Sequence, residues 1–115
     1  MNIGELAKAT GASARSIRHY EAEGLLASKR QGNGYRNFDG TAIETVRQIG
    51  WLLEMGLSIK AIRELAPCFP RDSESMGVCP KIRASLLNHR ASLKARHVGL
   101  GKLIKRIDSI LDIAA

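Results

Sequence analysis

The stretch Ser13-Ala-Arg-Ser-Ile-Arg-His-Tyr-Glu21 decides how the first part of this chain folds. Ser13 is a good N-cap for a helix, and Gly24 can adopt the left-handed conformation that ends one. Polar side chains crowd onto less than two turns of the predicted helix, and they are Arg15, Ser16, Arg18, His19 and Tyr20. Such a density of hydrogen-bond donors is typical of a helix that contacts phosphates and base edges in DNA.

A second short helix is predicted before this stretch. Ile3, Leu6 and Ala7 share one helical face, and Thr10-Gly11 ends that helix. Two short helices joined by a tight turn form the helix-turn-helix pattern. A plain helical hairpin is the alternative, and the polar density of the second helix favours DNA binding over it.

Between Leu26 and Asp39 the helical spacing gives way to short extended pieces around Gly32-Asn33-Gly34, where Asn-Gly indicates a hairpin. We interpret this hairpin as a wing that packs against the rest of the protein through the apolar side chains of Tyr35 and Phe38. The polar side chains expected to face phosphates or a groove edge are Lys29, Arg30, Asn33 and Arg36. A solvated turn without a partner is the alternative.

Two further helices are predicted after the wing. Asp39 can cap the first, which runs from about Thr41 to Met55. Its expected core residues are Ile43, Val46, Ile49, Leu52 and Leu53, with Trp51 as a large anchor. Ser58 can cap the second helix, which carries Lys60 in its first turn, within reach of a phosphate.

Residues 67–78 contain two prolines and no usable periodicity, so a connecting loop is predicted there. From Pro80 onward there is no further proline, which allows a helix of about 30 residues and about 45 Å. Two series of seven-residue repeats outline a coiled-coil seam of Ile82, Leu86, Leu93, Leu100, Leu103, Ile107 and Ile110. A helix this long has too little of its own protein to cover it, so a second copy of the chain is the expected partner.

The seam is imperfect. His89 and Arg96 occupy seam positions, and Gly99 and Gly101 each weaken a helix by about 1 kcal/mol relative to alanine. The segment 81–106 also holds eight basic residues and no acidic one. Two such helices repel each other unless the long side chains splay the charges outward, so an acidic effector or partner is a second interpretation of this strip.

The overall composition narrows the function classes. The net charge is +7, and residues 1–66 hold nine Lys/Arg against seven Asp/Glu while residues 67–115 hold nine against four. The N-terminus lacks a signal peptide and no stretch is apolar enough to span a membrane, so a cytoplasmic protein is expected. A Ser/His/Asp order, a paired-carboxylate spacing and a phosphate-binding glycine motif are all absent, which argues against an enzyme.

Five motifs in order resemble the signature of MerR-family transcriptional regulators: Asn2-Ile-Gly-Glu-Leu-Ala7, Ser16-Ile-Arg-His-Tyr-Glu21, Gly24-Leu-Leu26, Gly34-Tyr-Arg36 and Gly56-Leu-Ser58. The resemblance implies a mainly α protein with a winged helix-turn-helix DNA-binding domain at 1–66. It further implies a connecting loop with candidate sensor cysteines at 67–79 and an antiparallel coiled-coil dimerisation helix at 80–113. Such homodimers bind a pseudo-palindromic promoter element in double-stranded DNA and distort it so that RNA polymerase can engage.

The resemblance also assigns roles to single residues. Arg18 matches the recognition-helix arginine, Tyr20 a phosphate-contacting tyrosine and Arg36 the wing arginine. Arg15 and Ser16 match variable positions that set base preference. His19 matches a position that is usually aromatic, so packing or a phosphate contact is expected of it.

The effector is the least determined part. Cys79 matches a cysteine that some metal-sensing members place at the start of the dimerisation helix, and Cys68 has no counterpart. If the loop folds back, Cys68 and Cys79 can form a disulfide or hold a soft ion such as monovalent copper or mercury. Inert packing of both thiols is the alternative, so no cofactor is assigned and any metal is unknown.

These observations predict a homodimeric, sequence-specific transcription regulator, either thiol-responsive or metal-responsive. An architectural or excisionase-like DNA-bending module without an effector is the alternative, and the long dimerisation helix favours the regulator.

Overall fold

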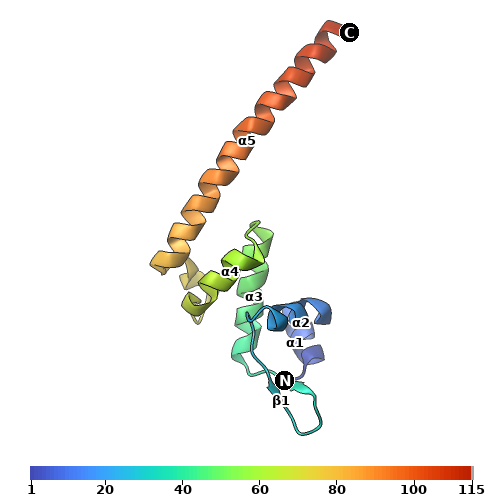
Figure 1. The fold of residues 1–115 in the computed structure, drawn as a ribbon, viewed down its shortest axis with the longest axis vertical. Coiled ribbons are helices and arrows are strands. Elements are labelled where there is room, and N and C mark those ends of the chain that lie inside the picture. The colour runs from blue at the N-terminus through green and yellow to red at the C-terminus, as the bar shows by residue number, and fades with distance from the viewer. Residues whose placement is uncertain (115) are drawn as a thin grey trace. The chain divides into compact units, whose positions relative to one another are not determined.

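The computed structural model describes residues 1–114, except for the side chains of Ser73 and Ala114. The chain is mainly helical, with one short two-stranded sheet (Figure 1). It divides into two compact units, of which the first is Met1–Ile82 and the second begins at Arg83. The winged helix-turn-helix and the long C-terminal helix predicted from the sequence are both present.

Helix α1 (Ile3–Thr10) and helix α2 (Ala14–Ala22) form the helix-turn-helix. The side chain of Asn2 caps α1 by accepting the Glu5 amide at 2.8 Å, and the Ser13 hydroxyl caps α2 by accepting the Ser16 amide at 3.0 Å. Gly11 lies between the two helices with φ of 78°, a left-handed conformation that costs glycine little. The tight turn is therefore specified by residues within it.

The wing consists of strands β1 (Lys29–Arg30) and β2 (Arg36–Asn37), which pair antiparallel with Arg30 opposite Arg36. At the tip, the Gly34 amide donates to the Gln31 carbonyl at 2.9 Å, and Gly34 has φ of 84°. At the base, the Phe38 amide donates to the Met1 carbonyl at 2.7 Å, and the Phe38 side chain is buried. The wing is thus anchored beside the start of α1.

Helices α3 (Thr41–Glu54) and α4 (Ile59–Leu65) pack with the helix-turn-helix and the wing in the first compact unit. Ser58 caps α4 by accepting the Ala61 amide at 3.1 Å, as predicted. The apolar faces of α1 to α4 meet in one core together with the segment after α2. The side chains most buried there are Leu6, Ile17, Leu25, Leu26, Phe38, Val46, Ile49, Leu52, Ile62 and Leu65.

Two aromatic residues do not lie where the sequence pattern predicted. Tyr35 was expected to support the wing but is 71% exposed, and Trp51 was expected to anchor the core but is 49% exposed. Ile43 and Leu53 are half-buried rather than fully packed. Val46, Ile49 and Leu52 already fill the inner face of α3, so the neighbouring positions fall on its flanks.

Residues 66–79 are more ordered than the predicted loop. They form two short 3₁₀ helices, η1 (Ala66–Cys68) and η2 (Ser73–Val78). The buried Gln48 on α3 donates its side-chain amide to the Pro70 carbonyl at 2.9 Å, and Met76 on η2 is buried. This segment is therefore held against α3.

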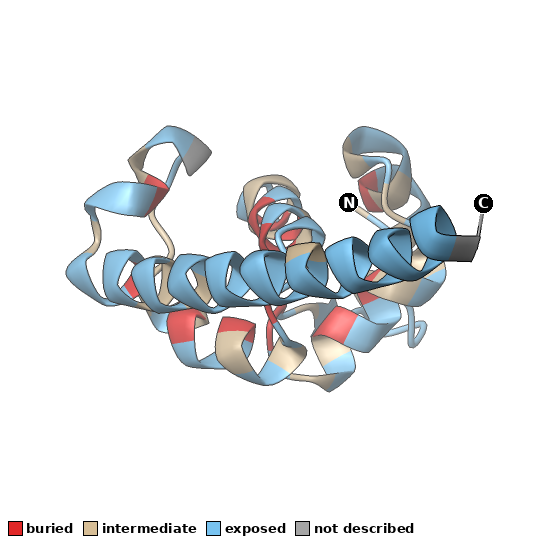
Figure 2. Cartoon of the chain, turned by 90° about the horizontal axis from the view of Figure 1, so that it is seen from above, coloured by how far each residue is buried: buried red, intermediate tan, exposed pale blue. Residues whose placement is uncertain are grey.

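Helix α5 (Pro80–Ala114) is one uninterrupted helix that passes through Gly99 and Gly101. Its first turn buries Ile82, whereas nearly all residues from Arg90 onward are exposed (Figure 2). Every helix in the described part of the chain is too short or too polar to span a membrane.

Candidate nucleic-acid interface

Helix α2 has a polar outer face and an apolar inner face. Ile17 and Tyr20 are buried, while Arg15, Arg18 and His19 are exposed. The inner residues are three apart, which places them on one side of the helix and turns the two arginines and the histidine outward. The exposed donors lie within two turns of a rigid helix, as direct contact with DNA requires.

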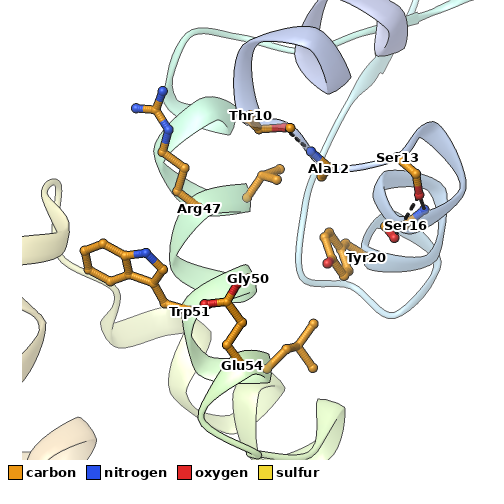
Figure 3. A pocket seen from close by; sticks show the side chains of 12 residues that line it. Thr10, Ala12, Ser13, Ser16, Tyr20, Arg47, Gly50, Trp51 and Glu54 are labelled. Carbon is orange, nitrogen blue, oxygen red and sulfur yellow. Dashed lines mark hydrogen bonds between the residues drawn. The ribbon is translucent and has the colours of Figure 1, made fainter.

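Two of the predicted contact residues on α2 have structural roles. The Ser16 amide and hydroxyl both bond to the Ser13 hydroxyl, each at 3.0 Å, so Ser16 belongs to the helix cap. Figure 3 shows this cap and the Tyr20 ring directed toward α3. Because Tyr20 is only 7% exposed, its side chain packs in the core beneath α2 and extends little from the surface.

The wing presents Lys29, Arg30, Asn33 and Tyr35 as exposed side chains. Two of them also stabilise the hairpin: Arg30 Nη1 donates to the Gly34 carbonyl at 2.9 Å, and Asn33 Oδ1 accepts the Tyr35 amide at 3.1 Å. These bonds limit the number of shapes that the tip can adopt. The wing is therefore a preformed basic hairpin rather than a loose turn.

Arg36 connects the wing to α2. Its Nε lies 2.5 Å from Glu21 Oε1, and both side chains are less than one-third exposed. Ser28 donates a second hydrogen bond to the same carboxylate. Burial raises the pKa of Glu21, but the bonds from Ser28 and Arg36 and the nearby arginine charges outweigh it, so the net pKa is lowered.

A second long-range link joins α2 to α4. Arg63 Nε donates to the Glu23 carbonyl at 3.0 Å, and the guanidinium also pairs with the Glu23 carboxylate. Arg63 thereby satisfies a carbonyl at the end of α2. A contact across 40 positions has no local signal in the sequence. Lys60, in the first turn of α4, is exposed as expected.

Two grooves border α2. One, of about 500 Å³, is lined by Arg15, Ser16, His19, Tyr20, Leu53 and Ile59. The other, of about 510 Å³, lies between α3 and the turn that joins α1 to α2 (Figure 3). Trp51 lies at the rim of this second groove, with its indole directed away from α2. Both grooves are open and shallow, which suits an extended partner better than an enclosed small molecule.

The connecting segment carries both cysteines. Cys68 and Cys79 are half-buried, and neither forms a disulfide. The backbone amide of Ile82, followed by that of Lys81 and by the Cys68 thiol, lowers the pKa of Cys79, although burial opposes them. No group of three or more His, Cys, Asp or Glu able to hold a metal ion is present in the described part of the chain.

The seam residues predicted on α5 fall into two groups. Ile82 is fully buried within the first unit and Leu86 is half-buried, so the seam cannot begin at Ile82. Farther along, Leu93 is partly exposed, and Leu100, Leu103, Ile107 and Ile110 are 55% to 67% exposed. Ile104 and Leu111 were not among the predicted seam residues. They follow Leu100 and Ile107 by four positions and extend the same exposed apolar stripe.

Comparison with known proteins finds relatives of this chain. Residues 1–67 match the family model described as MerR HTH family regulatory protein. The chain is 48% identical over 63 residues to nodulation protein NolA of Bradyrhizobium elkanii, covering 54% of this chain but 29% of NolA. It is 30% identical over 108 residues to a probable heavy metal-dependent transcriptional regulator of Haemophilus influenzae, covering 93% and 82% of the two chains.

A solved structure resembles the fold over nearly the whole chain. It is the transcription regulator PbrR691 from Ralstonia metallidurans CH34 in complex with lead(II), with a TM-score of 0.75 and 28% identity. The match covers 93% of this chain and 81% of that one. The Haemophilus influenzae relative and PbrR691, which both match over most of the chain, are transcription regulators, and the first is described as heavy metal-dependent.

Proposed function

This chain belongs to the MerR family of helix-turn-helix regulatory proteins, and we propose that it is a homodimeric regulator that binds a specific promoter element. The observation that carries the proposal is the pairing of an arginine-bearing helix face with a basic hairpin through Glu21 and Arg36. In this proposal, residues 1–66 bind DNA, residues 67–79 connect, and residues 80–113 dimerise.

Arg15 and Arg18 are the residues proposed to read base edges from α2, with His19 beside them. Arginine can donate two parallel hydrogen bonds to guanine, which makes it the strongest base reader on the helix. Lys29, Arg30, Asn33 and Tyr35 would contact phosphate and sugar from the wing, and Lys60 would contact phosphate from α4. Ser16, Tyr20 and Arg36 hold these elements in position, and any contact of their own with DNA is secondary.

The exposed stripe on α5 supports the dimer. Seven apolar side chains between Leu93 and Leu111 share one face of the helix and are 40% to 67% exposed. Such a stripe is unfavourable in water and is the usual signature of a helix that pairs with another. An antiparallel arrangement of two copies would cover it and separate the two DNA-binding units.

A dimer of this kind suits DNA distortion. A recognition helix and a wing at each end of the pair grip the duplex at two places, and bending or untwisting the DNA between them carries an energy that depends on its sequence. By resemblance to the family, this distortion would present the promoter to RNA polymerase in the cytoplasm.

The response is proposed to act through Cys68 and Cys79, because both thiols are free and lie in the segment that connects α4 to α5. The heavy-metal-dependent relatives favour a soft ion as a second candidate effector. Two sulfur donors without a third ligand nearby fit only a two-coordinate ion such as monovalent copper or mercury. Such an ion would bind both thiolates and offset part or all of their negative charge.

The contrasting function is an architectural module that bends DNA without sensing anything. Both functions need α2 and the wing, but only the regulator needs a response at the cysteines. A DNA-binding assay by itself therefore tests what the two have in common, and a change of promoter output with thiol state separates them.

Selection of binding sites from random duplex DNA with the reduced protein, followed by footprinting at moderate salt, tests the proposal. We expect an inverted repeat whose half-sites lie about 34 to 36 Å apart along the duplex, or a multiple of that distance. Binding that depends on salt but not on sequence would contradict it.

A further inference from the structure

We propose that Arg63 on α4 is a positioning residue that fixes the direction of the recognition helix α2 relative to α4. This inference rests on the proposed function, because it assigns to DNA binding a residue that acts through the protein rather than on the duplex. The alignment that Arg63 sets decides whether Arg18 on α2 and Lys60 on α4 can engage one duplex at the same time.

The start of α4 lies beside the middle of α2. The groove of about 500 Å³ that borders α2 is lined by residues that include Arg15 and His19 of α2 and Ile59, the first residue of α4. Four positions after His19 and Ile59, Glu23 at the end of α2 meets Arg63 of α4. Residues four apart share one face of a helix, so α4 follows α2 along its length.

The contact between Arg63 and Glu23 has two parts. Arg63 Nε donates to the Glu23 carbonyl at 3.0 Å, and Nη2 pairs with the carboxylate of the same residue. A backbone carbonyl moves only with the backbone that carries it, so the first bond holds the end of α2 itself and not merely a flexible side chain. The guanidinium supplies both donors from one rigid plane, which a lysine ammonium cannot do.

The exposure of this pair favours orientation over stability as its role. The side chains of Arg63 and Glu23 are 50% and 32% exposed, and ion pairs this accessible contribute little to the free energy of unfolding. Buried apolar side chains, including Ile17 on α2 and Ile62 and Leu65 on α4, already hold both helices in the core. Apolar packing is not directional, whereas a hydrogen bond is, so the pair restricts the angle between the two helices.

The end of α2 is also held from its other side. Glu21, two positions before Glu23, pairs with Arg36 of the wing. Residues two apart on a helix point about 200° away from each other, so the wing and α4 hold the end of α2 from opposite sides. The recognition helix is thereby aligned with both elements that carry the proposed phosphate contacts.

The alignment matters more for base contacts than for phosphate contacts. Lys60 lies three positions before Arg63 on α4, and both side chains are exposed. A hydrogen bond to a base edge requires a narrow range of distance and angle, whereas attraction to the phosphates does not depend on sequence or on exact register. Loss of the Arg63 contact should therefore impair binding to the selected site more than binding to random DNA.

Titrations of the full-length protein with its selected site and with a random duplex test the inference. Arg63→Ala should weaken binding to the selected site about tenfold and binding to random DNA by less than about twofold, with an unchanged salt slope. Arg71→Ala is the matched control, because it removes the same charge from an exposed position in the connecting segment. It should change both affinities by less than about twofold.

Two further variants separate alignment from the loss of a charge. Arg63→Lys keeps the charge and most of the stem, yet it should still weaken binding to the selected site about fivefold, because one ammonium cannot make both contacts. In a double-mutant cycle, Glu23→Ala should cost about threefold by itself and nothing further when it is added to Arg63→Ala. Circular dichroism establishes that each titrated variant is folded, and Arg63→Lys decides the outcome if Arg63→Ala is not.

Two kinds of result would overturn the inference. Equal losses on both duplexes, with a salt slope reduced by about one unit, would make Arg63 a phosphate contact. An Arg63→Lys protein that binds like the wild type, or losses that multiply in the double variant, would show that the two-part contact does not set the alignment.

The same titrations distinguish failure of this inference from failure of the proposed function. If the wild type does not discriminate between the selected site and random DNA, the proposed function itself fails. If the wild type discriminates and Arg63→Ala does so equally well, only the role of Arg63 is wrong.

Discussion

Arg36 on the wing and Glu21 on α2 form an ion pair, although they lie 15 positions apart in the chain. Arg36 Nε is 2.5 Å from Glu21 Oε1. The Ser28 hydroxyl, from the segment between them, bonds to the same carboxylate. The pair therefore sets the position of the wing relative to the recognition helix. An arginine that the sequence suggests as a free phosphate contact is already bound within the protein.

Glu21→Gln tests this pair through its pH dependence. Because the folded state lowers the pKa of Glu21 below its ordinary value of 4.5, the stabilisation is present above that value and is lost as the pH falls through the lowered pKa. We expect the variant to unfold about 1 kcal/mol more easily at neutral pH, with the difference from wild type shrinking below about pH 4. Urea denaturation over a series of pH values measures it.

Glu54→Gln provides the matched control, because Glu54 lies exposed on α3. Its effect should stay within about 0.5 kcal/mol. A Glu21→Gln difference that is the same at every pH would show that ionisation of Glu21 does not hold the wing.

Arg18 and Lys29 should affect DNA binding differently. Arg18→Ala is expected to cost about 1 to 3 kcal/mol on the selected site, because we propose that this side chain reads a base from α2. Lys29→Ala should weaken binding to specific and random DNA alike and reduce the salt slope by about one unit. Fluorescence titrations with both duplexes over a range of salt measure this, and equal losses from both variants on both duplexes would refute the assigned roles.

Gln48→Leu tests the attachment of the connecting segment. The substitution keeps the approximate size of the side chain but leaves the Pro70 carbonyl without its donor, so we expect a loss of about 1 to 3 kcal/mol in unfolding free energy. Gln31→Leu, the same substitution at an exposed position of the wing, serves as the control and should stay within about 0.5 kcal/mol. If both variants unfold alike, the Gln48 bond does not anchor the segment.

The charges on α5 predict the orientation of the dimer. Arg83, Arg90, Asp108 and Asp112 are exposed and fall within an arc of about 40° on one flank of the helix. In an antiparallel pair, the acidic end of one copy would lie beside the basic start of the other, whereas a parallel pair would place like charges together.

Replacing both Asp108 and Asp112 by lysine should therefore raise the dimer dissociation constant about tenfold at low salt, and replacing Arg83 and Arg90 by aspartate in the same chain should restore it. Analytical ultracentrifugation measures both variants. In a parallel dimer, the acidic residues of the two copies would already lie side by side. Replacing them by lysine would exchange repulsion between aspartates for repulsion between lysines, so the dissociation constant would change little.

The ends of the helices were predictable because their causes are local. Ser13 and Ser58 cap helices with their own hydroxyls, and Gly24 and Gly56 adopt φ of 77° and 90° after helix ends. The burial of Val46, Ile49 and Leu52 followed from helical periodicity. Periodicity could not place Tyr35 and Trp51, because an aromatic residue on a flank or at a hairpin tip is buried only if another element covers it.

The sequence by itself determined the family, the order of the elements and the polar face of α2, since capping and periodicity act over a few residues. Only the tertiary structure decided that Arg36 binds Glu21, that Arg63 closes the end of α2, and that Gln48 holds Pro70. Each of these contacts joins residues that lie 15 to 40 positions apart. No local signal encodes such a pair, because its geometry exists only after the helices have packed around their common core.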